Sequence, residues 1–263
     1  MKKIIEAVAF DMDGLMFDTE AVYWKSAAAL LGRRGYEYTE ELCNAIMGRP
    51  PRDCFELFKK TFSLPESWQE LQRESEDFFL GFLGEGFSAM PGLFELLDFL
   101  ELQDVPKCIC TSSSLRVVTA VLQSSCFKIP EAENAIATSQ SGCSSGCSGA
   151  KPTVSAHVSV GVSSFDFAGR FKFVLTAEDV VQGKPNPEIY LRAAEKMGVQ
   201  LSKLLVLEDS VAGCLAADAA GAFPVIVLAE HNKNGNFQKA KLIANSLNDP
   251  KIKSCIAPTN FHN

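Results

Sequence analysis

The chain has 263 residues, of which 47% are hydrophobic and 22% are charged, and its formal net charge is −7. This composition is typical of a folded protein and excludes wholesale disorder. An acidic chain without a block of lysine and arginine lacks the charge pattern of a nucleic-acid or anionic-membrane binder, so we expect neither partner. No apolar run approaches the ~18 residues that span a bilayer, and Glu6 interrupts the start before a signal-peptide core could form. We therefore expect a soluble, cytoplasmic monomer.

Short apolar runs that end in polar residues predict the strands of a buried sheet. They lack the alternation of polar and apolar residues that marks a half-exposed antiparallel strand. The runs cover residues 4–10, 108–110, 173–175, 204–207 and 225–228, and helical stretches lie between them at 93–102, 115–123, 187–198 and 211–220. This alternation predicts an α/β fold with a doubly wound parallel sheet, a Rossmann-like core. Ligands of such sheets bind at the carboxyl ends of the strands.

The stretch from residue 18 to residue 88 interrupts this alternation. Four segments in it are amphipathic at helical spacing, and no strand-like run separates them. They cover residues 23–31, 40–47, 52–62 and 68–83. We predict an inserted α-helical cap domain over 18–88, which leaves 1–17 and 89–263 for the catalytic core.

A second insertion is expected inside the core, at residues 125–164. Helical and strand periodicity are lost there, and residues 139–149 read SQSGCSSGCSG, a low-complexity run that cannot fill a core. A loop of this length is unusual in a compact domain. We expect a disordered excursion, and translation of an unspliced intron is the alternative explanation.

The most informative motif follows the first predicted strand. Asp11 and Asp13 stand two residues apart and run into Gly14, which permits a sharp turn. A strand alternates its faces, so the two carboxylates converge only if the chain turns between them. Two acids at one strand end repel each other unless a cation or a proton satisfies them. The alternative interpretation is a helix-capping aspartate beside a surface aspartate.

Three further polar clusters follow other strands or precede helices. They are Thr111-Ser112-Ser113-Ser114, Gly183-Lys184-Pro185 and Glu208-Asp209-Ser210. Each could be explained on its own, since hydroxyls and acids often cap helices and a turn lysine is often solvated. Four such clusters at the strand ends of one sheet indicate a single active site.

In this order, the clusters resemble the four motifs of the haloacid dehalogenase-like hydrolase superfamily. The stretches DMDGLMFDTE at 11–20 (after Phe10) and GKPNPEIY at 183–190 resemble its helical-cap phosphatase branch, whereas Asp218 replaces a small apolar residue that is usual there. The resemblance implies a Mg²⁺-dependent phosphomonoester hydrolase that acts on a small sugar or nucleoside monophosphate. By the same resemblance, Asp11 is the nucleophile that becomes an aspartyl phosphate, and Asp13 is the general acid and base.

The resemblance also implies the remaining members of the site. Thr111 and Lys184 complete the catalytic set. The expected Mg²⁺ ligands are Asp11, Asp13, Glu208 and Asp209. The expected substrate-binding residues are Thr111, Ser112, Ser113, Lys184, Glu20 and Arg52. The expected partner is a small phosphorylated metabolite.

Two other functions remain open from the sequence. The first is a phosphosugar mutase similar to the β-phosphoglucomutases, which needs a second phosphate site that Arg52 in the cap could supply. Against the mutase, Tyr23 stands where the resemblance would place its cap-hinge histidine. The second is a non-catalytic binding protein on the same scaffold.

Overall fold

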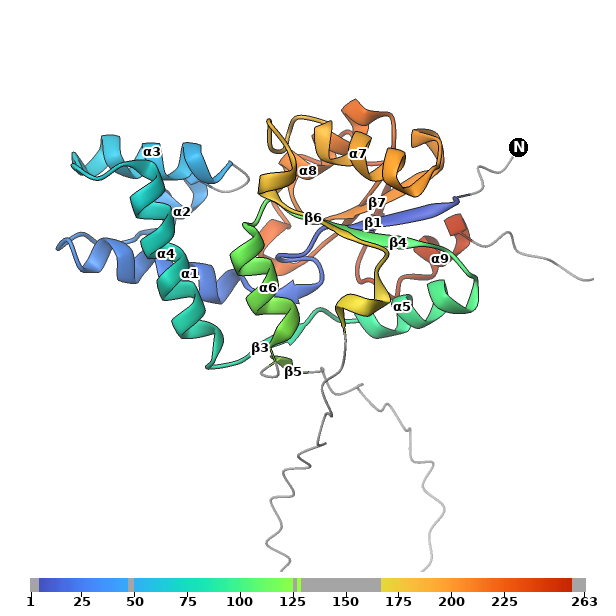
Figure 1. The fold of residues 1–263 in the computed structure, drawn as a ribbon, viewed down its shortest axis with the longest axis horizontal. Helices are drawn as coiled ribbons and strands as arrows, with labels where there is room; N and C mark the ends of the chain where they lie inside the picture. Colours follow the sequence, from blue (N-terminus) through green and yellow to red (C-terminus); the bar gives the residue numbers. More distant parts are fainter. Residues whose placement is uncertain (1–4, 47–49, 125–126, 129–166, 257–263) are drawn as a thin grey trace, which may run out of the picture.

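The computed structural model describes residues 5–46, 50–124, 127–128 and 167–256, and its centre is a six-stranded parallel sheet (Figure 1). The strand order is β6-β4-β1-β7-β8-β9. The strands are β1 (Ala7–Phe10), β4 (Lys107–Cys110), β6 (Val174–Leu175), β7 (Leu204–Glu208), β8 (Phe223–Val227) and β9 (Leu242–Ala244). The first strand therefore lies in the interior of the sheet, between β4 and β7.

Both faces of β1 are buried. Val8 and Phe10 join the core formed with α5 (Leu93–Leu102), α6 (Leu115–Gln123) and α9 (Pro250–Ile256). Ala7 and Ala9 face the opposite layer, which contains α7 (Glu188–Met197) and α8 (Val211–Ala220). Figure 1 shows α7 and α8 above the sheet and α5 and α9 below it. The predicted doubly wound α/β fold is confirmed, and the double burial explains why the strand sequences show no alternation.

Helix boundaries in the core follow local capping. Ser114 and Ser210 stand before α6 and α8, and their hydroxyls accept hydrogen bonds from the backbone N–H of Val117 and Gly213. Gly221, with φ of 78°, ends α8 in the left-handed conformation. The two serines place the N-termini of α6 and α8 shortly after the ends of β4 and β7, where the polar clusters lie.

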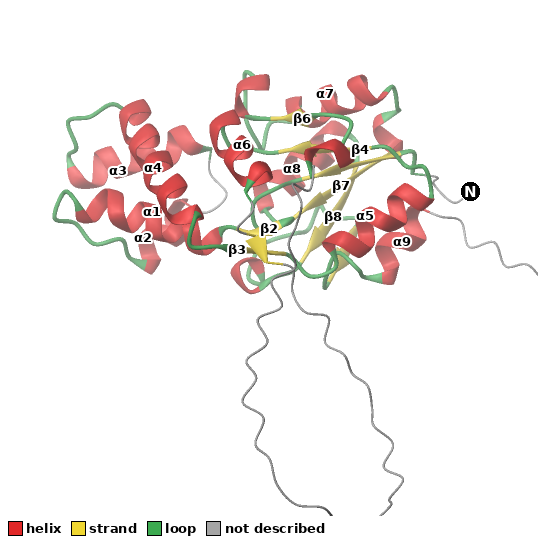
Figure 2. Ribbon diagram, turned by 60° about the horizontal axis from the view of Figure 1, so that its bottom comes forward, coloured by secondary structure: helices red, strands yellow, loops and turns green. Residues whose placement is uncertain are grey.

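A separate helical unit follows β1 in the chain (Figure 2). It contains α1 (Glu20–Gly32), α2 (Glu40–Ile46), α3 (Pro51–Phe62) and α4 (Trp68–Leu83). The unit has its own core, in which Leu30, Leu31, Phe58 and Leu71 are buried. These helices occupy the interval in which a cap was expected, and the exact domain limits stay a prediction.

The chain enters and leaves the helical unit through paired strands. In the small sheet, β2 (Phe17–Asp18) runs antiparallel to β3 (Phe87–Ala89), and β3 runs parallel to β5 (Phe127–Lys128). The two connections between core and cap therefore lie side by side. Most of the predicted 125–164 insertion lies outside the described residues.

Within the described part of the chain, no helix is both long and apolar enough to cross a bilayer. The cytoplasmic location and the monomeric state expected from the sequence stay predictions.

Candidate active site

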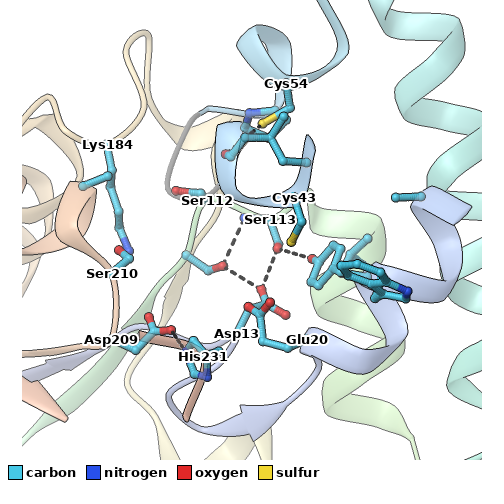
Figure 3. A pocket seen from close by; sticks show the side chains of 18 of the residues that line it. Asp13, Glu20, Cys43, Cys54, Ser112, Ser113, Lys184, Asp209, Ser210 and His231 are labelled. Carbon is cyan, nitrogen blue, oxygen red and sulfur yellow. Dashed lines mark hydrogen bonds and ion pairs between the residues drawn. The ribbon is translucent and has the colours of Figure 1, made fainter. Parts of the chain in front are cut away.

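The polar clusters meet at the carboxyl edge of the parallel sheet. Asp11 directly follows β1, Thr111 follows β4 and Asp209 follows β7, while Lys184 reaches the same place from the segment between β6 and α7. All four line a cavity of about 640 Å³ that side chains of the cap close from the other side (Figure 3). The clustering predicted from strand ends is therefore present in the structure.

Asp11 and Lys184 form a buried ion pair. The Lys184 Nζ lies 2.5 Å from Asp11 Oδ1 and 2.6 Å from Glu208 Oε1, and it also donates to the Cys110 carbonyl at 2.9 Å. Burial raises the pKa of Asp11 well above its usual value, Lys184 opposes the rise, and the nearby Glu208 and Asp209 carboxylates add to it. Burial lowers the pKa of Lys184, but the two carboxylates outweigh it and the net pKa is raised. Lys184 is therefore held as a cation beside the predicted nucleophile.

Glu208 anchors Lys184 from behind. Its side chain is fully buried, and Oε1 also accepts a hydrogen bond from the Tyr190 hydroxyl at 2.5 Å, while Oε2 accepts one from the Ser210 hydroxyl at 2.9 Å. A Cβ atom added at Gly213 would lie 1.9 Å from the Glu208 carboxyl carbon. The glycine at that helix position is therefore required for Glu208 to fit.

Hydroxyl groups surround the carboxylate of Asp13. Thr19 Oγ1 lies 2.8 Å from Oδ1, and Ser113 Oγ and Thr111 Oγ1 lie 2.6 and 3.4 Å from Oδ2. Burial raises the pKa of Asp13, and these hydrogen bonds oppose the rise. The Tyr23 hydroxyl of α1 lies 2.8 Å from Ser113 Oγ, so one cap side chain is linked to Asp13 through a serine.

Asp209 has a partner that the sequence analysis did not assign. His231 Nε2 lies 2.7 Å from Asp209 Oδ2, and Asn232 donates to the Asp209 backbone carbonyl at 2.9 Å. Glu20 lies in the same group, because one ligand atom of each of Glu20, Asp209 and His231 falls within 4.8 Å of the others. Burial raises the pKa of Glu20 to about 7. Figure 3 shows His231 beside Asp209 at the base of the cavity.

The core acids offer a set of ligand atoms suited to a hard cation. Carboxylate oxygens of Asp11, Glu208 and Asp209 lie within 4.8 Å of one another, and all three residues are buried. Oxygen-only sites of this kind suit Mg²⁺. Gly14 allows the backbone after Asp13 to lie close to the Asp209 carboxylate, since its φ is +74° and a Cβ there would lie 2.3 Å from Asp209 Oδ2.

The remaining predicted site residues divide into two groups. Ser112, Ser113 and Glu20 line the cavity, as expected of substrate-binding residues. Glu208 is not on the cavity wall, and Arg52 is exposed near the start of α3 while its neighbours Pro51 and Cys54 face the cavity. The roles of Glu208 as a metal ligand and of Arg52 in substrate binding stay predictions.

Two contributors to the site were missed by the sequence analysis. His231 follows β8, which corresponds to the predicted strand at 225–228. Polar residues that follow a strand end mark the site in such sheets, and the same reasoning applied to this strand would have found His231. Tyr190 lies within the GKPNPEIY stretch, but apolar spacing on α7 indicates only a core residue. Its hydroxyl partner, Glu208, becomes visible only in three dimensions.

Comparison with known proteins agrees with this geometry. The sequence pattern of the haloacid dehalogenase-like hydrolases matches residues 5–221. A Drosophila melanogaster protein named "Probable pseudouridine-5'-phosphatase" is 30% identical over 229 residues, which cover 86% of this chain and 83% of that protein. The "Phosphorylated carbohydrates phosphatase" of Thermotoga maritima is 26% identical over 82% of each chain.

Solved structures share the fold at lower identity. CbbY from Rhodobacter sphaeroides in complex with phosphate is 19% identical with a TM-score of 0.69, and it covers 93% of this chain and 96% of its own. The β-phosphoglucomutase of Clostridium difficile is 20% identical with a TM-score of 0.66, over 96% and 97% of the two chains. The family match over most of the chain, together with the motif residues gathered at the strand ends, leads to one conclusion: this chain belongs to the haloacid dehalogenase-like hydrolases.

Proposed function

We propose that this hydrolase is a Mg²⁺-dependent phosphatase of small phosphomonoesters, in the class of sugar and nucleoside monophosphates such as pseudouridine 5'-phosphate. The observation that carries the proposal is the convergence of Asp11, Asp13, Lys184 and Asp209 on one cavity. Phosphatase relatives from Drosophila melanogaster and Thermotoga maritima support the reaction class. They do not select a substrate for this chain.

The first step is attack by Asp11 on phosphorus. Its carboxylate forms a bond to phosphorus, and the bond from phosphorus to the leaving oxygen breaks, so an aspartyl phosphate and an alkoxide are produced. Lys184, 2.5 Å from Asp11, reduces the repulsion between this carboxylate and the incoming phosphate dianion. Ser112, which lines the cavity, is assigned to donate to the phosphoryl oxygens, because the hydroxyls of Thr111 and Ser113 donate to Asp13.

The second role is proton transfer by Asp13. The raised pKa of Asp13 suits an acid that protonates the leaving oxygen, and the resulting carboxylate then takes a proton from the water that hydrolyses the aspartyl phosphate. Water supplies the oxygen of the released phosphate, and Asp11 is regenerated. The ring of hydroxyls from Thr19, Thr111 and Ser113 fixes the orientation of the Asp13 carboxylate for both transfers.

The buried acids explain the need for a divalent cation. The Asp209 carboxylate lies near Asp11 and raises its pKa, so the two buried acids repel each other when both are ionised. Mg²⁺ held by their carboxylates and by the Asp13 backbone carbonyl would reduce this repulsion and neutralise charge that develops on the phosphoryl group. Glu208 has its oxygens occupied by Lys184, Tyr190 and Ser210, so we assign it to holding Lys184 in place.

The cap wall favours hydrolysis over the mutase alternative. A mutase must hold a second phosphate, which requires a cationic partner in the cap. Among the cap residues that the structure describes, no lysine, arginine or histidine lines the cavity. Arg49, which the sequence places in the same loop as Arg52, lies outside the described residues.

Replacement of the nucleophile tests the proposal. Asp11→Asn keeps the shape of the side chain and removes the attacking charge, so phosphate release should fall by several orders of magnitude. Thermal unfolding should remain cooperative, because Lys184 keeps its pairing with Glu208. A panel of phosphorylated metabolites measured with both proteins supplies the assay. Substantial turnover by pure, folded Asp11→Asn would rule out the aspartyl phosphate.

Metal removal tests the cation independently. Phosphate release should require Mg²⁺ and stop in EDTA, and Ca²⁺ should inhibit because it recruits additional oxygen ligands and disturbs in-line attack. Restoration of turnover by added Mg²⁺ is the control for reversible metal loss. Full activity of metal-stripped protein in EDTA would contradict the proposed site.

A further inference from the structure

The cap side of the cavity differs in chemistry from the core side. The core side carries the acids, the hydroxyls and Lys184, whereas most of the cap side consists of rings, aliphatic side chains and the thiols of Cys43 and Cys54 (Figure 3). Six aromatic residues of the cap line it: Tyr23, Trp24, Tyr38, Phe55, Phe58 and Phe79. A phosphate bound at Asp11 would therefore direct the rest of its molecule toward an aromatic surface.

Trp24 is the most exposed of these six residues. Its side chain is 38% exposed although it lines the cavity, whereas Phe58 and Phe79 are 2% and 1% exposed. The indole lies 4.8 Å from the Tyr38 ring at 61°, and Tyr38 in turn meets Phe58 edge-on at 6.2 Å. The ring is thus held by a packed cluster while part of it faces open space, which is the arrangement of a stacking surface.

Polar groups on the same wall are few, and some are already engaged. The Gln72 amide donates to Glu76 Oε1 at 2.9 Å, and Glu76 also faces Arg116 at 3.9 Å. The Tyr23 hydroxyl is bonded to Ser113. A polyhydroxylated sugar that enters this space exchanges its bonds to water for contacts with rings, and each unpaired hydroxyl costs binding free energy.

We propose that the leaving group of the substrate carries an aromatic ring, such as the base of a nucleoside monophosphate, which stacks against Trp24, and that bare sugar phosphates are poor substrates. This inference rests on the proposed phosphatase function and narrows its substrate class. Apolar burial and ring stacking supply affinity for the leaving group, while the phosphate site supplies the chemistry. Trp24 is then a specificity-determining residue that touches the substrate away from the reacting atoms.

Two monoesters of primary alcohols, 2-phenylethyl phosphate and ribose 5-phosphate, test the inference, since the first leaving group carries an aromatic ring and the second is a polyhydroxylated sugar without one. We expect kcat/KM for 2-phenylethyl phosphate to exceed that for ribose 5-phosphate by at least about fivefold, mostly through KM, because only the first leaving group can stack on an aromatic side chain. In Trp24→Ala this ratio should fall toward one, and Trp24→Phe should restore part of it.

Tyr36→Ala is the matched control. Tyr36 is equally exposed, at 39%, and its ring contacts that of Phe62 at 4.5 Å in the same helical unit, but it does not line the cavity. The preference should be the same in this variant as in the wild type. A wild-type ratio at or below one, or an unchanged ratio in Trp24→Ala, would overturn the inference.

Failure of the proposed function gives a different result. If neither monoester releases phosphate, the phosphatase proposal is wrong. The affinities of the two monoesters for the wild-type protein, measured by calorimetry, then test separately whether the cap binds an aromatic ring. Tighter binding of 2-phenylethyl phosphate than of ribose 5-phosphate would support the aromatic surface without turnover. Equal or weaker binding would reject it.

Discussion

Two glycines inside helices differ in the space around them: a side chain would clash at Gly213 but not at Gly81. Gly213 in α8 leaves room for the Glu208 carboxyl group, which would lie 1.9 Å from an added Cβ, whereas no heavy atom lies within 4 Å of a Cβ added at Gly81 in α4. Gly213→Ala should destabilise the protein by ~1–3 kcal/mol through overpacking. It should also lower phosphate release, because Glu208 must move and Lys184 loses its anchor.

Gly81→Ala is the matched control at an exposed helix position. It should stabilise the protein by ~0.5–1 kcal/mol, because alanine loses less backbone entropy than glycine in a helix. Urea unfolding measures both changes, and phosphate release distinguishes the site effect from a general loss of stability. Equal stability of the two variants would contradict the close packing at Glu208.

Individual site residues could be predicted where the sequence places them directly after a strand. Asp11, Thr111 and Asp209 fall into this class, because an apolar run fixes the strand and its end fixes the edge of the sheet. Arg52 was predicted from a resemblance to the β-phosphoglucomutases, but the exposed position of its side chain depends on how α3 packs, which the sequence does not give. The position of His231 after β8 could have marked it as a site residue, but its contact with Asp209 is a tertiary one that becomes visible only in the structure.

At the scale of elements, one carboxylate joins three segments of the core. Glu101 of α5 accepts hydrogen bonds from Arg170 at 2.8 Å through both oxygens, and from Lys107 of β4 at 2.9 Å. The hydrogen bond from Arg170 lowers the pKa of Glu101 to about 2, burial opposes the shift, and Lys107 reinforces it. The network therefore stabilises the fold when Glu101 is ionised.

This arrangement predicts a pH-dependent effect of Glu101→Gln. A folded-state pKa below the usual 4.5 contributes stability above about pH 4.5, and the contribution is lost as the pH falls toward about 2. The side chain is 45% exposed, so solvent screening limits the loss at pH 7 to about 1 kcal/mol. Urea unfolding at pH 7 and pH 3.5 should show a smaller difference at the lower pH. Glu95→Gln, at an exposed position of α5, is the control, and a pH-independent difference would contradict the network.

Elements with strong local signals were predicted closely. The predicted helices at 68–83, 93–102, 115–123 and 211–220 coincide with α4, α5, α6 and α8. Capping serines fix the start of α4, α6 and α8, whereas α5 begins after Gly92. The two-residue and three-residue strands β2 and β3 were missed. Their existence depends on pairing between segments about 70 residues apart, which leaves no periodic pattern in either segment.

At the scale of the whole molecule, the predicted insertion can be tested by removal. Deletion of residues 130–164 should leave phosphate release intact, because a low-complexity segment contributes no apolar core. Replacement of residues 139–149 alone is a milder control. A deletion variant that folds but has no turnover would show that the segment serves the active site.

The pairing of Phe17 with Ala89 has a consequence for how this architecture can diversify. Since the helical unit departs from and returns to adjacent positions, a chimaera needs only two neighbouring junctions to receive a foreign cap. Such an exchange would replace the aromatic wall around Trp24 in one event and leave Asp11, Asp13 and Lys184 in the unchanged core. If the cap selects the substrate as proposed, substrate choice and phosphoryl chemistry lie on separable segments of the chain, and recombination at Phe17 and Ala89 should change the substrate without rebuilding the catalytic centre.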